Sequence, residues 1–221
     1  MKIGVFGTGM VGETFADKFV ALGHTVRMGS RSAANEKGAA WARKAGELGS
    51  HGTFADTAAF GELLVNCTQG TASEDVLRAA GRENLNGKIL IDVANPLVHE
   101  AGKGARLAFG MDDSLGERLQ ALCPELRVVK ALNTVNCSVM VDPARVPGDH
   151  TAFVCGNDAA AKAEVERLLR EWFGWRDVID LGDISGARAT EGYLLLWLRL
   201  WSSVKTLDLN VQVRRASKAP A

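Results

Sequence analysis

The stretch GVFGTGMVGETFA, residues 4–16, decides the fold, because it places three glycines in the spacing Gly7-x-Gly9-x-x-Gly12. The apolar run KIGVF before the turn is typical of a buried strand. Residues 10–22 after it carry apolar side chains at helical spacing. A glycine pattern of this kind indicates a dinucleotide-binding turn only where it joins a strand to a helix, which is the predicted context here.

Each glycine of the turn has a separate expected role. Gly7 permits the tight turn, Gly9 lets a pyrophosphate approach the backbone, and Gly12 lets the helix pack close to the strand. The backbone N–H groups at the helix start offer an anion site. We therefore predict that a nucleotide cofactor binds along Gly7, Thr8, Gly9, Met10, Val11 and Gly12.

The segment VRMGSRSAANEK, residues 26–37, indicates which dinucleotide binds. The second predicted strand ends within this segment, about twenty residues beyond the turn. In NAD-binding domains a carboxylate at this place accepts a hydrogen bond from the free ribose 2′-hydroxyl. This chain instead has Ser30 and Arg31, and an arginine binds phosphate in bidentate fashion. Thr8 and Lys37 add a hydroxyl and a charge nearby. The sequence therefore predicts NADP, with its 2′-phosphate at Ser30 and Arg31.

Strand-like runs alternate with helix-like stretches along the chain, and runs such as LLVNC and ILIDV are apolar on both faces. This order predicts an α/β, Rossmann-like, doubly wound and mostly parallel sheet. We assign residues 1–148 to an NADP-binding Rossmann domain. Residues 149–221 are assigned to a small C-terminal α/β extension on the same sheet.

Small polar residues follow several of the predicted strands. Ligands of open α/β sheets lie beyond the carboxyl ends of the strands, so these residues are expected to face the cofactor. The predicted contacts are Cys67, Thr68, Asn95, Pro96 and Asn133. Lys130 is expected to hold either the end of its strand or a phosphate group, and His99 is expected to be a loop residue. No side chain is therefore assigned as an obligatory acid or base.

Charge and cysteine content exclude several other classes of protein. Lys and Arg total 26, as do Asp and Glu, and a neutral chain argues against nucleic-acid binding. The four cysteines form no C-x-x-C pair and the four histidines are scattered, so no metal site is predicted. No apolar run reaches the length of a bilayer span, and the first residues do not form a signal peptide. We expect a cytoplasmic protein with reduced thiols and no membrane partner.

Four segments, in this order, resemble those of the deazaflavin-dependent NADP oxidoreductases, also called NADPH-dependent coenzyme F(420) reductases. They are IGVFGTGMVGETFADKFVALGHTVRMGSR, LIDVANPL, VVKALNTVN and GDISGARATEGYLLLWLRL. The same segments resemble the related oxidoreductase domain of six-transmembrane ferric reductases. The resemblance spans nearly the whole chain, but the membrane half of the ferric reductases has no counterpart in it.

The resemblance implies hydride transfer between NADP(H) and a flavin-like or deazaflavin acceptor, which is a small-molecule partner, and it implies a homodimer. Ring-to-ring hydride transfer makes few demands on side chains, because the cofactors supply the chemistry. The alternative is a non-catalytic NADP(H)-sensing or regulatory Rossmann protein. A stripe of apolar residues at helical spacing fits either core packing or a dimer contact: Leu194, Trp197, Leu198 and Trp201.

Overall fold

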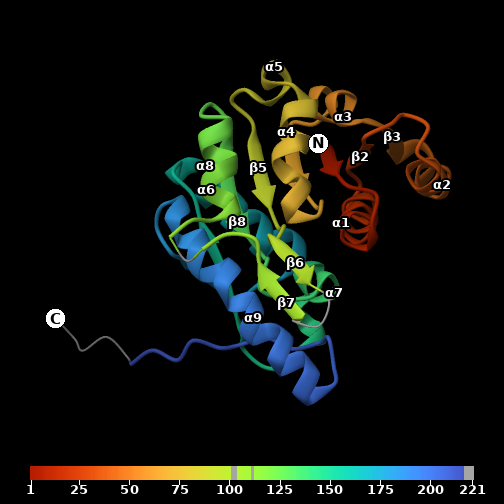
Figure 1. Cartoon of the computed structure of the whole chain (residues 1–221). Coiled ribbons are helices and arrows are strands. Elements are labelled where there is room, and N and C mark those ends of the chain that lie inside the picture. Colours follow the sequence, from red (N-terminus) through yellow and green to blue (C-terminus); the bar gives the residue numbers. More distant parts are fainter. Residues whose placement is uncertain (101–103, 111, 217–221) are drawn as a thin grey trace.

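The computed structural model describes residues 1–100, 104–110 and 112–216 (Figure 1). Strands and helices alternate from the N-terminus, as predicted. The first part contains β1 (Lys2–Phe6), α1 (Met10–Ala21), β2 (Thr25–Ser30), α2 (Glu36–Ala45), β3 (Gly49–Thr53), α3 (Phe54–Phe60), β4 (Leu63–Asn66), α4 (Ser73–Ala80), α5 (Arg82–Leu85) and β5 (Ile89–Asp92). A short 3-10 turn, η2 (Gly70–Ala72), precedes α4.

A two-stranded hairpin then leaves the main sheet before the chain returns to it. The later elements are β6 (Leu97–Glu100), β7 (Gly104–Leu107), α6 (Leu115–Leu122), β8 (Arg127–Ala131), α7 (Cys137–Val141), β9 (Thr151–Cys155), α8 (Ala159–Leu168), β10 (Asp177–Asp180) and α9 (Ala187–Val204). A π-helical turn, η4 (Leu169–Phe173), extends α8, and a 3-10 turn, η5 (Ile184–Gly186), precedes α9.

The main sheet has eight strands in the order β10-β9-β8-β5-β4-β1-β2-β3. Neighbouring strands are parallel except for the antiparallel pair β8–β9. The strand order reverses between β1 and β4, and this reversal opens a crevice at their carboxyl ends. The prediction of a Rossmann-like, mostly parallel sheet is confirmed.

The C-terminal residues join the same sheet rather than forming a separate layer. β9 pairs with β8 through Lys130–Cys155 and Ala131–Val154, and β10 continues the sheet in parallel with β9. β9 therefore overlaps only the last residues of β8 and begins beyond its carboxyl end. Residues 149–216 extend the sheet on the crevice side, and the boundary at residue 148 remains a proposal.

Each face of the sheet is covered by its own set of helices, which accounts for the apolar runs in the central strands. One buried cluster includes Phe15 and Phe19 of α1, together with Phe173 of η4. The cluster on the other face includes Leu77 of α4 and Leu119 of α6. Because both faces are covered, strands such as β4 are buried at every residue.

The sequence did not indicate several short elements. α3 begins with a capping box, in which Thr53 accepts from the Asp56 N–H and the Asp56 carboxylate accepts from the Thr53 N–H. The hairpin β6–β7 lies beside α9 beyond the carboxyl end of β5 (Figure 1). Among the described residues no helix combines the length and the apolarity needed to cross a membrane.

Candidate cofactor site

The glycine turn has the geometry that its spacing predicts. Gly7 has a φ of 111°, in the region that favours glycine, and its N–H donates to the Gly29 carbonyl at 2.9 Å. A Cβ at Gly9 would meet nothing within 4 Å, so the turn is open above this residue. A Cβ at Gly12 would lie 2.2 Å from the Gly7 carbonyl oxygen. Gly12 is therefore required by close packing, whereas Gly9 leaves room for a ligand.

The N-terminus of α1 faces this open space. Gly9 is its N-cap residue, and no side chain caps the helix. The first helical hydrogen bond runs from the Glu13 N–H to the Gly9 carbonyl, at 2.9 Å. The N–H groups of Met10 and Val11 come before it and have no acceptor within the helix. Unpaired N–H groups at the positive end of a helix dipole are the arrangement to which anions bind in dinucleotide-binding turns.

A pocket of about 320 Å³ lies next to the turn, at the end of β2. It is lined by Gly7, Thr8, Gly29, Ser30, Arg31, Ser32, Asn35 and Phe54. The lining contains no carboxylate. Arg31 is exposed and makes no hydrogen bond or ion pair within the described part of the chain. Ser30 is buried, and its hydroxyl donates to the Ser32 carbonyl at 2.7 Å, which shapes the turn that presents Arg31.

Lys37 lies on the other side of Thr8. It lines a neighbouring groove with Met10, Glu13 and Lys44, outside the lining of the Arg31 pocket. Thr8 belongs to both linings. The structure thus brings Thr8, Ser30 and Arg31 into one pocket and places Lys37 in the adjoining one.

A larger pocket of about 560 Å³ extends the site from the glycine turn to the end of β4. Its lining includes Gly7, Gly9, Arg31, Cys67, Thr68 and, from α4, the carboxylate Asp75. Burial, with a smaller effect of the nearby Asp92 carboxylate, raises the pKa of the Cys67 thiol well above its ordinary value. Cys67 is therefore a wall of the pocket and not a nucleophile.

Asn95 and Asn133 meet at the ends of β5 and β8. The Asn95 amide donates to the Asn133 carbonyl at 2.7 Å, and the Asn133 amide donates to Asn95 Oδ1 at 2.9 Å. Leu132, buried just before Asn133, has a φ of 62°, which is uncommon for a residue other than glycine. A strained backbone of this kind persists only where its surroundings fix it. Here the next residue, Asn133, is held by its two hydrogen bonds with Asn95.

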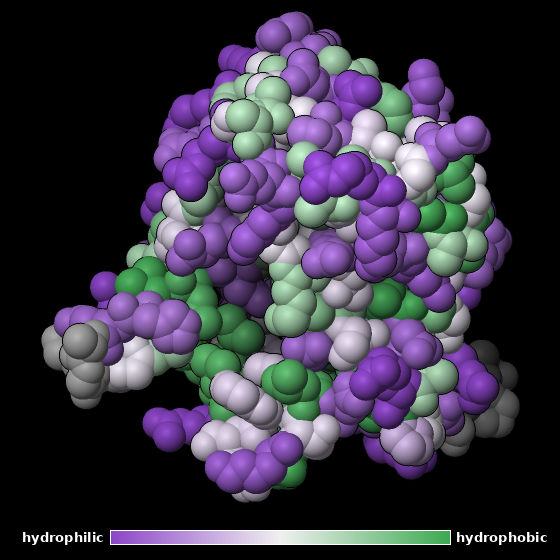
Figure 2. Space-filling model, turned by 90° about the vertical axis from the view of Figure 1, so that its right-hand side faces the viewer, coloured by the Kyte–Doolittle hydropathy of each residue, from purple (hydrophilic) through white to green (hydrophobic). Residues whose placement is uncertain are grey.

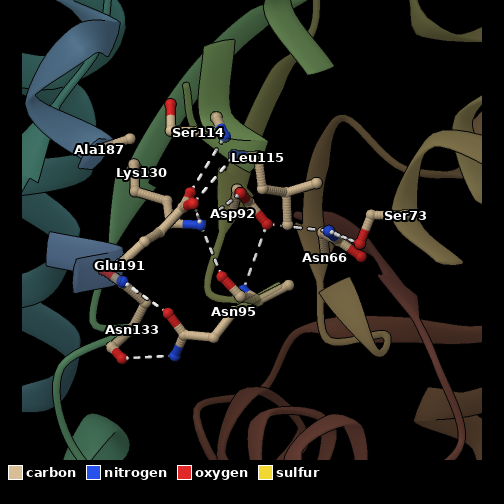
Figure 3. A network of polar contacts seen from close by, with 12 residues as sticks. Asn66, Ser73, Asp92, Asn95, Ser114, Leu115, Lys130, Asn133, Ala187 and Glu191 are labelled. Carbon is tan, nitrogen blue, oxygen red and sulfur yellow. Dashed lines mark hydrogen bonds and ion pairs between the residues drawn. The ribbon is translucent and has the colours of Figure 1, made fainter. Parts of the chain in front are cut away.

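A chain of buried polar groups connects the strand ends (Figure 3). The Thr68 hydroxyl donates to Asn66 Oδ1 at 2.6 Å, and the Asn66 amide donates to Asp92 Oδ1 at 2.8 Å. The Lys130 ammonium lies 3.0 Å from Asp92 Oδ2 and 2.8 Å from Glu191 Oε1. Burial alone would lower the pKa of Lys130, but the Asp92 and Glu191 carboxylates raise it above its ordinary value. Lys130 is a permanent cation that anchors the end of its strand.

Sequence reasoning missed three members of this chain: Asn66, Asp92 and Glu191. Asn66 and Asp92 each end an otherwise apolar strand, and that pattern could have indicated buried partners. Nothing local to Glu191 indicates that it is buried, because its partners lie on other elements. His99 is exposed on β6. The described residues contain no group of three or more His, Cys, Asp or Glu side chains able to hold a metal ion.

The apolar stripe on α9 divides between core and surface. Leu194 and Trp197 are buried, whereas Trp201 is 43% exposed and stacks on Trp197 with ring centroids 6.1 Å apart. Leu195 and Leu196 are also exposed. In the view of Figure 2, apolar side chains gather around a hollow in the lower part of the molecule. The stripe therefore packs in the core at its start and reaches the surface further along the helix.

Comparison with known proteins shows the family of the chain. The model of the family described as NADP oxidoreductase, coenzyme F420-dependent, matches residues 2–96. A protein from Arthrobacter sp. FB24, provisionally assigned as an F420-dependent NADP reductase, has a crystal structure that superposes with a TM-score of 0.91. It is 48% identical, over 97% of this chain and 100% of that one. The chain belongs to the coenzyme F420-dependent NADP oxidoreductase family.

Two further relatives extend the family relationship. The F420-dependent NADP reductase of Methanocaldococcus jannaschii is 32% identical over 133 residues, which are 60% of this chain and 59% of the relative. The metalloreductase STEAP3 of Rattus norvegicus is 29% identical over 214 residues, 96% of this chain and 40% of the relative. The chain thus matches less than two thirds of the length of these two proteins.

Proposed function

We propose that the protein is an NADP(H)-dependent oxidoreductase that binds NADP(H) across the glycine turn. The observation that carries this proposal is the unpaired Arg31 in the pocket at the end of β2, next to the turn, where the lining contains no carboxylate; the carboxylate Asp75 lines only the larger adjoining pocket. An aspartate or glutamate at this place would repel a 2′-phosphate, whereas a guanidinium binds it in bidentate fashion. The pyrophosphate then lies over Gly9, at the N–H groups of Met10 and Val11.

The acceptor is proposed to be a deazaflavin or a flavin. Support comes from the names of the relatives from Arthrobacter and Methanocaldococcus. It also comes from the carboxyl ends of β5 and β8, which supply the amides of Asn95 and Asn133 rather than an acid–base pair. A flavin-like ring takes its proton from water, so the protein needs only to align donor and acceptor, about 3–3.5 Å apart. No side chain is assigned as a catalytic acid or base.

Arg31→Ala tests the proposal through cofactor preference. Loss of a charge-assisted contact should weaken NADPH binding roughly ten- to hundredfold. NADH, which has no 2′-phosphate, should be nearly unaffected. The matched control is Arg43→Ala, which removes an exposed arginine from α2 outside the pocket lining. Equal affinity of the unmutated protein for NADPH and NADH, measured by titration calorimetry, would refute the proposal.

Activity is tested separately by NADPH oxidation with coenzyme F420, flavin mononucleotide or a ferric chelate. Tight NADPH binding without oxidation by any of them would favour an NADP(H)-sensing protein.

Self-association and location complete the proposal. The exposed apolar residues of α9, Leu195, Leu196 and Trp201, are proposed to form a homodimer contact, because tryptophan is common in interface cores. All four cysteines are free and buried, which fits a reducing compartment such as the cytoplasm.

A further inference from the structure

A buried ionic triad lies behind the candidate site: Asp92 on β5, Lys130 on β8 and Glu191 on α9 (Figure 3). The side chains of all three are at most 2% exposed. Three protons of the Lys130 ammonium meet three acceptors: Asp92 Oδ2 at 3.0 Å, Glu191 Oε1 at 2.8 Å and the Ala94 carbonyl at 2.5 Å. No proton of this ammonium is left for a ligand, so Lys130 has no direct role toward one.

The triad carries one excess negative charge, which backbone N–H groups compensate. Glu191 accepts from the Leu115 N–H at 2.9 Å and from the Gly116 N–H at 3.1 Å, both in the first turn of α6. A carboxylate at a helix N-terminus is favourable because of the helix dipole. Asp92 accepts from the Asn66 amide and from the Ala94 N–H. Every carboxylate of the triad therefore has donors on more than one side.

The triad hydrogen-bonds both backbone polar groups of Ala94, the residue just before Asn95 and Pro96 of the candidate site. The Ala94 N–H donates to Asp92 Oδ1 at 3.2 Å, while its carbonyl accepts from Lys130. Asn95 and Pro96 follow directly. The space behind them is closed by Gly70, where a Cβ would lie 2.2 Å from the Asn95 carbonyl oxygen. The position of Asn95 and Pro96 is thus set by charges buried beneath them.

Stability alone does not explain such a triad. Replacing buried ion pairs by apolar residues of similar volume is often neutral or stabilising, because burial removes charges from water at high cost. What the triad adds is a fixed geometry between three elements, β5, β8 and α9. With the 2′-phosphate at Arg31 and the pyrophosphate over Gly9, the nicotinamide half of the cofactor extends across the crevice toward the carboxyl ends of β4 and β5, which Asn95 and Pro96 follow. We infer that Lys130, together with Asp92 and Glu191, is a positioning residue for this nicotinamide end. This inference rests on the proposed function.

The test compares two ligands on two variants. NADPH is compared with 2′-phospho-ADP-ribose, which lacks only the nicotinamide. Lys130→Met removes the ammonium. Glu191→Gln keeps the side-chain volume but replaces one carboxylate oxygen by an NH₂ group, which cannot accept from Lys130 or from the N–H groups of Leu115 and Gly116. The matched control is Glu117→Gln, because Glu117 bridges α6 and α9 through Arg188 without contacting Ala94. The variants are checked for folding by circular dichroism, and Glu191→Gln carries the test if Lys130→Met does not fold.

The expected result is a loss confined to the nicotinamide half. NADPH should bind roughly tenfold more weakly to both triad variants, while 2′-phospho-ADP-ribose binds as before. Single-turnover hydride transfer to coenzyme F420 at saturating NADPH should fall about 100-fold, the effect of a misplacement near 1 Å. Glu117→Gln should change none of these values.

Two results would overturn the inference. An equal loss for both ligands would mean that the triad only supports the fold. Unchanged binding and transfer in a folded triad variant would mean that the triad does not set the position of the site. Failure of the unmutated protein to bind either ligand would instead refute the proposed function.

Discussion

The two substitutions Gly9→Ala and Gly12→Ala add the same methyl group to one turn but should impair different properties of the protein. A Cβ at Gly9 meets no protein atom within 4 Å, and the residue has φ −89° and ψ −178°, an extended conformation open to alanine. A Cβ at Gly12 would lie 2.2 Å from the oxygen and 3.0 Å from the carbon of the Gly7 carbonyl. Gly9→Ala should therefore impair binding, and Gly12→Ala should impair folding.

The magnitude for Gly12→Ala is a balance of two terms. Overpacking in a close-packed interior costs about 1–3 kcal/mol, and here the clash is with backbone that cannot rotate away. Alanine is a better helix former than glycine by about 1 kcal/mol, which offsets part of this. The difference is about 0–2 kcal/mol, and because the clash is with backbone we expect a fall in the free energy of unfolding in the upper half of this range, about 1–2 kcal/mol.

The main effect of Gly9→Ala should be on the affinity for NADPH. Alanine is a poorer N-cap than glycine, so stability should fall by less than about 1 kcal/mol. A methyl above the turn keeps the pyrophosphate from the N–H groups at the start of α1. Hydrogen bonds to a charged group contribute about 1.5–3 kcal/mol each, so one lost bond weakens NADPH binding by one to two orders of magnitude.

Urea denaturation and calorimetric titration with NADPH measure the two quantities on the same samples. Wild-type affinity of Gly9→Ala for NADPH would refute the path of the pyrophosphate over this residue. Wild-type stability of Gly12→Ala would refute the close packing of α1 on the turn.

Two further predictions concern assembly and pH. Trp201→Glu places a charge among the exposed apolar residues of α9. It should shift the protein from dimer to monomer in analytical ultracentrifugation. An unmutated protein that is already monomeric at micromolar concentration would contradict the proposed dimer. The Arg188 guanidinium, more than the Ser114 hydroxyl, holds the pKa of Glu117 below its ordinary value. Because the folded-state pKa is depressed, this contact stabilises the protein near neutral pH, and the stabilisation is lost as the pH falls through the folded-state pKa. Arg188→Gln should accordingly lower stability near neutral pH but not at a pH below the folded-state pKa of Glu117, where this carboxyl is protonated in both the folded and the unfolded state. Urea denaturation at several pH values measures this difference.

The sequence predicted the sheet and the glycine turn well, because both depend on local patterns. A strand, three spaced glycines and an amphipathic helix leave one common arrangement for residues 2–22. The pocket around Arg31 was also predictable, since it lies at a fixed distance from the turn along the chain. The contact of these residues with NADP(H) stays a prediction.

The buried triad was beyond prediction for a physical reason. Lys130 was expected to hold either a strand end or a phosphate, and the structure pairs it with Asp92 of β5 and Glu191 of α9, which are far from it along the chain. Pairing over such distances depends on how the sheet is ordered and not on any local pattern. The hairpin β6–β7 was missed because its strands lie apart from the main sheet and only partly bury their side chains.

Aromatic contacts between α1 and η4 connect the two parts of the chain through one buried cluster. Phe15 and Phe19 belong to the helix of the glycine turn, and Phe173 belongs to the C-terminal extension. Their ring centroids lie 5.8 Å (Phe15–Phe173) and 5.9 Å (Phe19–Phe173) apart in one buried cluster. Separating the parts would expose these rings to water on both sides. We therefore expect the extension and the Rossmann part to unfold together, so that a nucleotide bound by the first part would also stabilise the second by mass action.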